Sequence, residues 1–177
     1  MEGKSLSRDL IPEIVAADTY RVSGGPLRLF AALNDSLALC LHDEARGVGG
    51  LLHLRFVGGG GRPSDATDVE FSSLLGLLDR FKNEVIGQAA PSDAVQARIL
   101  AHETPSAAAE EGDASLVDLL KADLIDAGIT CGSQTLRRTE PAYVCFQPGE
   151  GRVRLCAASE MPPAAATGRL QGSSGTR

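Results

Sequence analysis

The sequence predicts a single α/β domain of the layered α+β type, in which helices pack on a mixed β-sheet. Short apolar runs of strand length fill the first half, and two longer segments then repeat apolar residues at helical spacing. The chain returns at its end to strand-length runs joined by Pro and Gly. With 177 residues, 43% hydrophobic and 23% charged, it is long enough to bury one core.

The first half is expected to be rich in β-structure. An extended lead-in interrupted by Pro12 comes first, and a Ser-Gly-Gly-Pro turn at residues 23–26 separates the next two apolar runs. Leucines then alternate with smaller or polar residues over positions 37–41, and residues 43–50 supply turn chemistry before the apolar run resumes. The expected strands cover residues 20–22, 27–33, 37–41 and 51–56.

The second half is expected to alternate helices and strands. Thr67 and Glu70 form a capping box for a first helix that Gly87 ends, and a second helix begins near Asp113 and ends at Gly128. The expected strands here cover residues 94–101, 129–135, 142–146 and 152–157. A folded domain over residues 1–157 therefore precedes residues 158–177, whose Ala, Gly, Ser and Pro content predicts a disordered tail.

Composition excludes several functional classes. A net charge of −6 repels a phosphate backbone, and an aromatic content of 4% without Trp disfavours base stacking, so nucleic acid is not an expected partner. No apolar run reaches the roughly 20 residues of a membrane span, and the N-terminus lacks a signal-peptide core, so we expect a cytoplasmic protein without membrane insertion.

The cysteines and glycines do not predict a cofactor site. Cys40, Cys131, Cys145 and Cys156 show no C-x-x-C spacing, and we expect reduced thiols in the core rather than disulfides or a zinc site. The glycine run at residues 58–61 is followed by neither Lys-Ser nor Lys-Thr, so it is read as a flexible loop and not as a phosphate cradle. No cofactor and no metal are expected.

Residues 33–43 read L-N-D-S-L-A-L-C-L-H-D, and V-G-G-L-L-H follows at residues 48–53. This window resembles the CheD family of chemoreceptor glutamine deamidases, whose pattern is L-G-S-C-V-A-V-C-L-Y-D, a short turn, and I-G-G-x-x-H. In that family a catalytic cysteine precedes a histidine by seventeen positions; here those positions hold Ser36 and His53. The resemblance also implies the same order of helices, strands and closing hairpin through about Cys156.

The chain departs from the family pattern at several positions. The family threonine six residues before the nucleophile is replaced by Phe30, and the Gly-Ser pair before the nucleophile by Asn34 and Asp35, which still tolerate a left-handed turn. The family G-G-A after the middle strand appears as residues 101–103, Ala-His-Glu, and a later T-G-G is lost around residues 135–138. The nucleophile and its surroundings have therefore changed.

Ser36 and His53 are the candidate catalytic pair. A serine that attacks an amide needs a base, a group that orients the base, and oxyanion donors. Phe30 offers no acceptor that could orient His53, which leaves Asp35 or Asp43 as candidates. Cys40 shares the face of Ser36 but lies about 13 Å further along the strand, too far to share its site. His42 and His102 are interpreted as non-catalytic, with His102 at the start of a loop.

The resemblance implies a CheD-like chemotaxis protein that interacts with the cytoplasmic helices of methyl-accepting chemoreceptors, with a CheC-type phosphatase as a further partner. We expect a degenerate glutamine deamidase that acts mainly by binding. The alternative is an active chemoreceptor glutamine deamidase or amidohydrolase that uses Ser36 and His53 as nucleophile and base. A third interpretation, an unrelated small-molecule binding domain, follows from the fact that the resemblance is dense in one window only.

Overall fold

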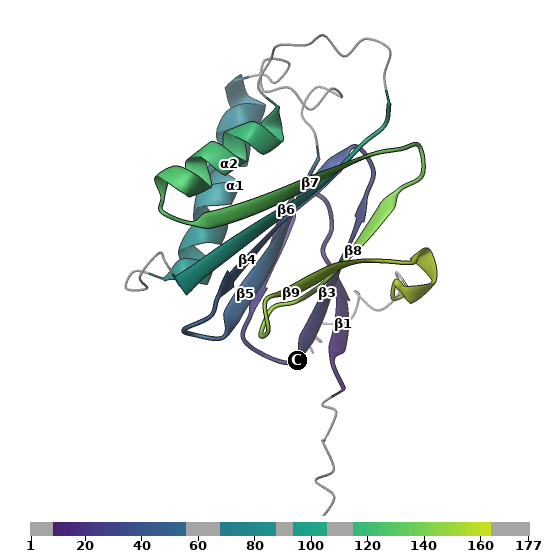
Figure 1. Cartoon of the computed structure of the whole chain (residues 1–177), viewed down its shortest axis with the longest axis horizontal. Helices are drawn as coiled ribbons and strands as arrows, with labels where there is room; N and C mark the ends of the chain where they lie inside the picture. The colour runs from purple at the N-terminus through teal and green to yellow at the C-terminus, as the bar shows by residue number, and fades with distance from the viewer. Residues whose placement is uncertain (1–8, 56–67, 88–93, 106–114, 164–177) are drawn as a thin grey trace, which may run out of the picture.

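The computed structural model describes residues 9–55, 68–87, 94–105 and 115–163, which form two helices and nine strands in two mixed sheets (Figure 1). This confirms the α/β class. Predictions for Phe56, the glycine run at 58–61, Thr67 and Asp113 lie outside these residues. The elements in chain order are β1 (Ile11–Ile14), β2 (Thr19–Ser23), β3 (Leu27–Leu33), β4 (Ser36–Asp43), β5 (Val48–Arg55), α1 (Asp68–Ile86), β6 (Val95–Glu103), α2 (Leu116–Asp126), β7 (Thr130–Arg137), β8 (Ala142–Gln147) and β9 (Arg152–Cys156).

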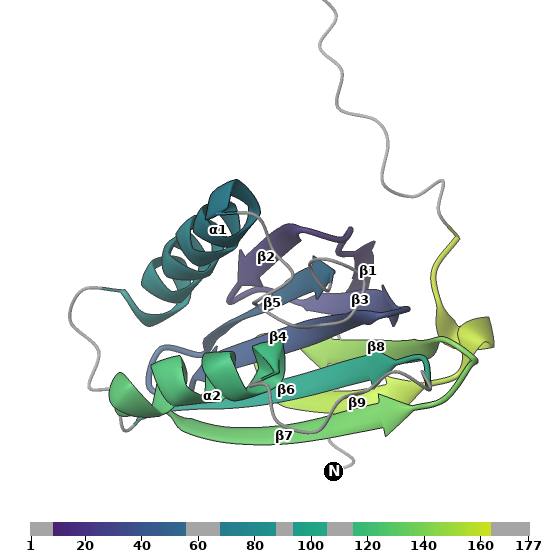
Figure 2. The same cartoon turned by 90° about the horizontal axis from the view of Figure 1, so that it is seen from above.

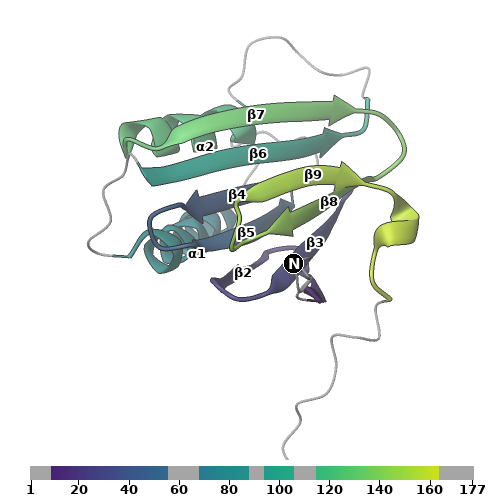
Figure 3. The same ribbon diagram turned by 60° about the horizontal axis from the view of Figure 1, so that its bottom comes forward.

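The strands divide into two sheets that stack face to face. One has the order β2-β5-β4-β6-β7, with a parallel β6–β7 pair, and the other has the order β1-β3-β8-β9, with a parallel β1–β3 pair. Helices α1 and α2 cover the outer face of the five-stranded sheet, and the four-stranded sheet covers the opposite face (Figures 2 and 3). The molecule therefore has three layers, with the five-stranded sheet in the middle.

Strand β4 shows why the middle sheet is buried on both faces. Its Leu37, Leu39 and Leu41 pack with the helices, whereas Ala38 and Cys40 pack with the four-stranded sheet. Because successive side chains of a strand point to opposite faces, the alternation of large and small residues matches two different layers. The helix layer receives the bulky side chains.

Two adjacent glycines in β5 fit the middle sheet between its neighbours. A Cβ atom on Gly50 would lie 2.6 Å from Cε2 of Phe81 in α1, and one on Gly49 would lie 2.6 Å from the carbonyl oxygen of Pro148 in the β8–β9 hairpin. Both contacts are closer than a methyl group allows. The Gly-Gly pair is therefore required because the helix layer and the hairpin both approach the β5 backbone.

The structure defines the first residue of α2 and the last residue of β6. The N-cap of α2 is Ser115, whose hydroxyl accepts from the Asp118 amide at 3.2 Å in a capping box, and the helix begins at Leu116. Strand β6 continues to Glu103, which places His102 inside the sheet and not in a loop. The described start of the predicted tail carries a short 3-10 helix, Ala158–Glu160, where Glu160 pairs with Arg154.

Candidate functional site

Ser36 and His53 lie on neighbouring strands of the middle sheet. In the β4–β5 register Ser36 is opposite Arg55 and Ala38 is opposite His53, so Ser36 and His53 are diagonal neighbours on one face. That face is the one covered by the four-stranded sheet, because Ala38 belongs to the core between the two sheets. The pairing of β4 with β5 thus brings together residues seventeen positions apart.

The two side chains are hydrogen-bonded. The Ser36 Oγ lies 3.1 Å from Nε2 of His53, and Nδ1 of the same imidazole lies 3.1 Å from the carbonyl oxygen of Val15. Because a carbonyl oxygen only accepts, Nδ1 carries the proton and Nε2 offers a lone pair to the serine hydroxyl. This is the tautomer that a general base for a serine nucleophile needs.

Burial keeps the His53 imidazole neutral. Desolvation lowers its pKa from the ordinary value of 6.5, against a smaller opposing effect of the hydrogen bond to Val15. A neutral imidazole accepts the Ser36 proton at neutral pH. The pair therefore has the hydrogen-bond polarity of a Ser–His dyad.

The group that orients His53 is a backbone carbonyl and neither of the carboxylates considered from the sequence. The Asp35 carboxylate accepts from the amide of Thr104 at 2.7 Å, and the Asp43 carboxylate accepts from the amide of Arg46 at 3.2 Å. Phe30 is buried in β3, and its chain neighbours Leu29 and Ala31 belong to the core between the sheets, so its ring lies on the opposite face of the four-stranded sheet from the dyad. Val15 carries no sequence signal for this role because any residue supplies a carbonyl.

The turn before Ser36 has the predicted left-handed backbone. Asp35 has a φ of 45°, which short polar residues tolerate. The two peptide N–H groups of this turn are already bonded: that of Asn34 donates to Ser36 Oγ at 3.1 Å, and that of Asp35 donates to Nδ1 of His102 at 3.2 Å. Neither is free to stabilise an oxyanion.

The dyad is closed to solvent. Ser36 is 1% exposed, His53 5% and His102 0%. A glutamine side chain on a protein substrate has to reach the hydroxyl to be hydrolysed, and these exposures leave it no room without movement of the surrounding chain. The geometry therefore provides a nucleophile–base pair that is closed to solvent, beside a turn whose two peptide N–H groups are already bonded.

The other candidates are structural. Cys40 is buried and its thiol pKa is strongly raised by desolvation, which makes it a poor nucleophile. His42 hydrogen-bonds the carbonyl of Pro148 at 2.9 Å, near the end of β4 remote from Ser36. All four cysteines are free. Within the described ranges, no group of three or more His, Cys, Asp or Glu could hold a metal ion, and no helix is long and apolar enough to cross a membrane.

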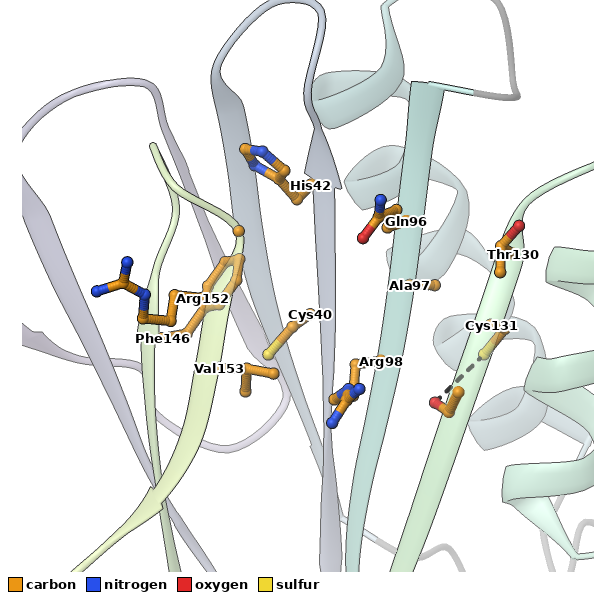
Figure 4. Close-up of a pocket in the computed structure, with 12 residues that line it drawn as sticks. Cys40, His42, Gln96, Ala97, Arg98, Thr130, Cys131, Phe146, Arg152 and Val153 are labelled. Atoms are coloured by element: carbon orange, nitrogen blue, oxygen red, sulfur yellow. Dashed lines mark hydrogen bonds between the residues drawn. The ribbon is translucent and has the colours of Figure 1, made fainter.

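A groove of about 590 Å³ lies apart from the dyad, between β9 and the inner faces of β4, β6 and β7 (Figure 4). Arg98 of β6 points into it, and within the described part of the chain no carboxylate pairs with this guanidinium. The size of the groove is within the range of small-molecule pockets. Neither Ser36 nor His53 lines it.

No protein-family model matches the chain, and no curated protein matches it. The resemblance to CheD proteins consequently rests on the motif of residues 33–53 alone.

Proposed function

We propose that this protein is a CheD-like binding protein of the chemotaxis system, which recognises the cytoplasmic helices of methyl-accepting chemoreceptors without hydrolysing their glutamines. The observation that carries the proposal is the Ser36–His53 pair: it is hydrogen-bonded at 3.1 Å, as a nucleophile–base pair would be, yet Ser36 is 1% exposed. A hydrogen-bonded pair that is closed to solvent is poorly placed to hydrolyse a protein side chain, which supports binding as the activity. The proposed setting is the cytoplasm, with a CheC-type phosphatase as a further partner.

The exchange of a thiol for a hydroxyl supports the same conclusion. A cysteine paired with imidazole has an appreciable thiolate fraction before substrate arrives, whereas serine must lose its proton during attack and depends on oxyanion donors for a useful rate. The two peptide donors of the turn before Ser36, those of Asn34 and Asp35, are already bonded within the protein. The expected rate of amide hydrolysis is therefore very low.

The alternative is an active glutamine deamidase, which the tautomer of His53 favours. In that reaction Ser36 Oγ attacks the side-chain amide carbon, and His53 Nε2 takes the hydroxyl proton and passes it to the departing ammonia. Water then hydrolyses the serine ester and leaves a glutamate carboxylate. The dyad geometry provides the base for these steps, whereas access and oxyanion stabilisation require a rearrangement of the turn at residues 34–36.

One experiment separates the two functions. A purified chemoreceptor cytoplasmic fragment is titrated into the protein in a calorimeter, and the same mixture is analysed by mass spectrometry for amide-to-acid conversion. The proposal predicts binding without conversion, equally for the native protein and Ser36→Ala. Conversion that Ser36→Ala and His53→Ala both abolish would establish the hydrolase instead, and absence of both binding and conversion would overturn the chemotaxis assignment.

The groove at Arg98 supports the small-molecule alternative. A ligand there would contact Arg98 and lie beside the open edge of β9, remote from the dyad. Thermal-shift measurements with small carboxylates test this, since a ligand that raises the melting temperature of the native protein and not that of Arg98→Ala would identify the groove as a binding site. Equal shifts in both proteins would exclude it.

A further inference from the structure

We propose that His102 is the plug that closes the Ser36 site: its imidazole fills the space beside the serine and holds the peptide N–H that a substrate carbonyl would otherwise use. This inference rests on the proposed reading of Ser36 and His53 as a closed nucleophile–base pair. It adds a regulatory residue from a third strand, outside the motif of residues 33–53.

The strand register places His102 directly beside Ser36. In the antiparallel β4–β6 pair, Ser36 and His102 are Cα partners, so their side chains project from the same face. Side chains directly opposite each other on antiparallel strands have Cβ atoms about 4.5–5.5 Å apart. Ser36 is therefore flanked by two imidazoles, that of His53 on β5 and that of His102 on β6.

The hydrogen bonds of His102 determine its tautomer. Nε2 lies 2.8 Å from the carbonyl oxygen of Glu140, which only accepts, and Nδ1 accepts from the amide of Asp35 at 3.2 Å. The proton is thus on Nε2, and Nδ1 presents a lone pair to the turn. The imidazole links the loop before β8 to the peptide that precedes the nucleophile position.

Nδ1 of His102 accepts the hydrogen bond that a substrate oxyanion would otherwise accept. An oxyanion site uses N–H donors about 2.7–3.1 Å from the charged oxygen, and the peptide N–H groups nearest the nucleophile are suited to that role. Here the N–H of Asp35 points at an imidazole nitrogen instead. The Asp35 carboxylate is in turn bound to the amide of Thr104 at 2.7 Å, which fixes the turn in this bonded state.

Full burial of the plug agrees with this role. His102 is 0% exposed and makes two hydrogen bonds to backbone groups, so it is held as firmly as a core residue. A side chain of this size cannot share its space with a substrate. Opening the site requires the side chain at position 102 to move or to release the Asp35 amide.

A thiol placed at position 36 reports access directly. In the Ser36→Cys background, the protein is treated with iodoacetamide, and alkylation at position 36 is followed by peptide mass spectrometry, which separates it from the four native cysteines. Adding His102→Ala is expected to raise the alkylation rate at position 36 by about tenfold or more, because reaction no longer waits for a local opening. His42→Ala is the matched control, and we expect it to leave that rate unchanged.

Two conservative variants separate hydrogen bonding from simple loss of packing. Asn in place of His102 presents an oxygen near the position of Nδ1 and keeps the bond to the Asp35 amide, whereas Gln reaches towards the Glu140 carbonyl and gives up the Nδ1 acceptor. We expect slow alkylation and a protected Asp35 amide in His102→Asn, and fast alkylation and rapid hydrogen exchange of that amide in His102→Gln.

An unchanged alkylation rate in folded His102→Ala and His102→Gln proteins would overturn the plug. Equal rates in the Asn and Gln variants would overturn the assignment of the Asp35 bond. These measurements use no receptor, so the plug stands or fails independently of receptor binding. Failure of the receptor assay with accelerated alkylation would reject the chemotaxis assignment and keep the plug.

Discussion

The two faces of the five-stranded sheet differ in what they bury. The face under the helices carries large aliphatic side chains along β4, with Leu37, Leu39 and Leu41 fully buried. The face under the second sheet carries small residues in the middle of the same strand and polar residues at one end, where Ser36, His53 and His102 meet. The comparison indicates that the helix side supplies most of the stability and the inter-sheet side holds the candidate site.

The largest expected effect is on the helix side. Leu39→Ala removes a fully buried side chain from the core under α1 and α2, and we expect the free energy of unfolding to fall by about 2–5 kcal/mol. Leu75→Ala is the matched control, since Leu75 on α1 is 37% exposed. Urea unfolding measures both. A loss below about 1 kcal/mol for Leu39→Ala would contradict the assignment of stability to this face.

Gly50 tests how closely the helix layer approaches the sheet. Gly50→Ala forces a methyl group to within 2.6 Å of Phe81 and 2.9 Å of the Arg21 carbonyl, and we expect it to destabilise the fold by about 1–3 kcal/mol.

The control substitution is expected to change the free energy of unfolding in the opposite direction. Gly76 lies in α1 with nothing within 4 Å of its Cβ position, so Gly76→Ala should stabilise the protein by about 0.5–1 kcal/mol through helix propensity. Chemical denaturation of the two variants under one set of conditions compares them. A Gly50→Ala variant that is as stable as the native protein, or more stable, would show that α1 does not press on β5 as described.

A smaller effect on stability is expected from the titration of His53, at the polar end of the inter-sheet face. Burial lowers the pKa of His53 below 6.5, so between the folded-state and unfolded-state pKa values the unfolded chain binds more protons than the folded protein. Stability is therefore lost as the pH falls below about 6.5, and this residue contributes at most about 1.4 kcal/mol per pH unit.

His53→Gln removes that contribution. The stability of the native protein should fall more steeply than that of His53→Gln between pH 6.5 and the folded-state pKa, whereas Ser36→Ala, which keeps the imidazole buried, should follow the native slope. Thermal unfolding at a series of pH values gives the slopes. Parallel slopes for the native protein and His53→Gln would mean that His53 is not held neutral by burial.

The sequence predicts local features of this fold better than its long-range contacts. Alternation in residues 37–41 and the turn that follows predict the β4–β5 hairpin, and the hairpin alone brings Ser36 and His53 onto one face. The left-handed Asp35 follows from the tolerance of short polar side chains for positive φ. These features depend on neighbours within about twenty positions along the chain, which is the range over which periodicity is informative.

The parts that were missed depend on pairing between distant segments. The β4–β6 register places His102 opposite Ser36 across 66 positions, and no pattern in either strand specifies that partner. The Val15 carbonyl that orients His53 comes from the chain after β1, and a backbone oxygen leaves no trace in residue identity. The division of the strands into two sheets has the same origin, because alternation does not reveal which strands pair.

The tautomer of His53 is the most direct test of the central geometry. Long-range ¹⁵N–¹H correlation spectra of the protein, with His53→Gln used to assign the signals, report which ring nitrogen carries the proton. We predict a neutral imidazole protonated on Nδ1, bound to the Val15 carbonyl, with Nε2 accepting from Ser36, and one that stays neutral as the pH falls through 6.5. A proton on Nε2, or an imidazole that titrates at its ordinary pKa, would contradict the account.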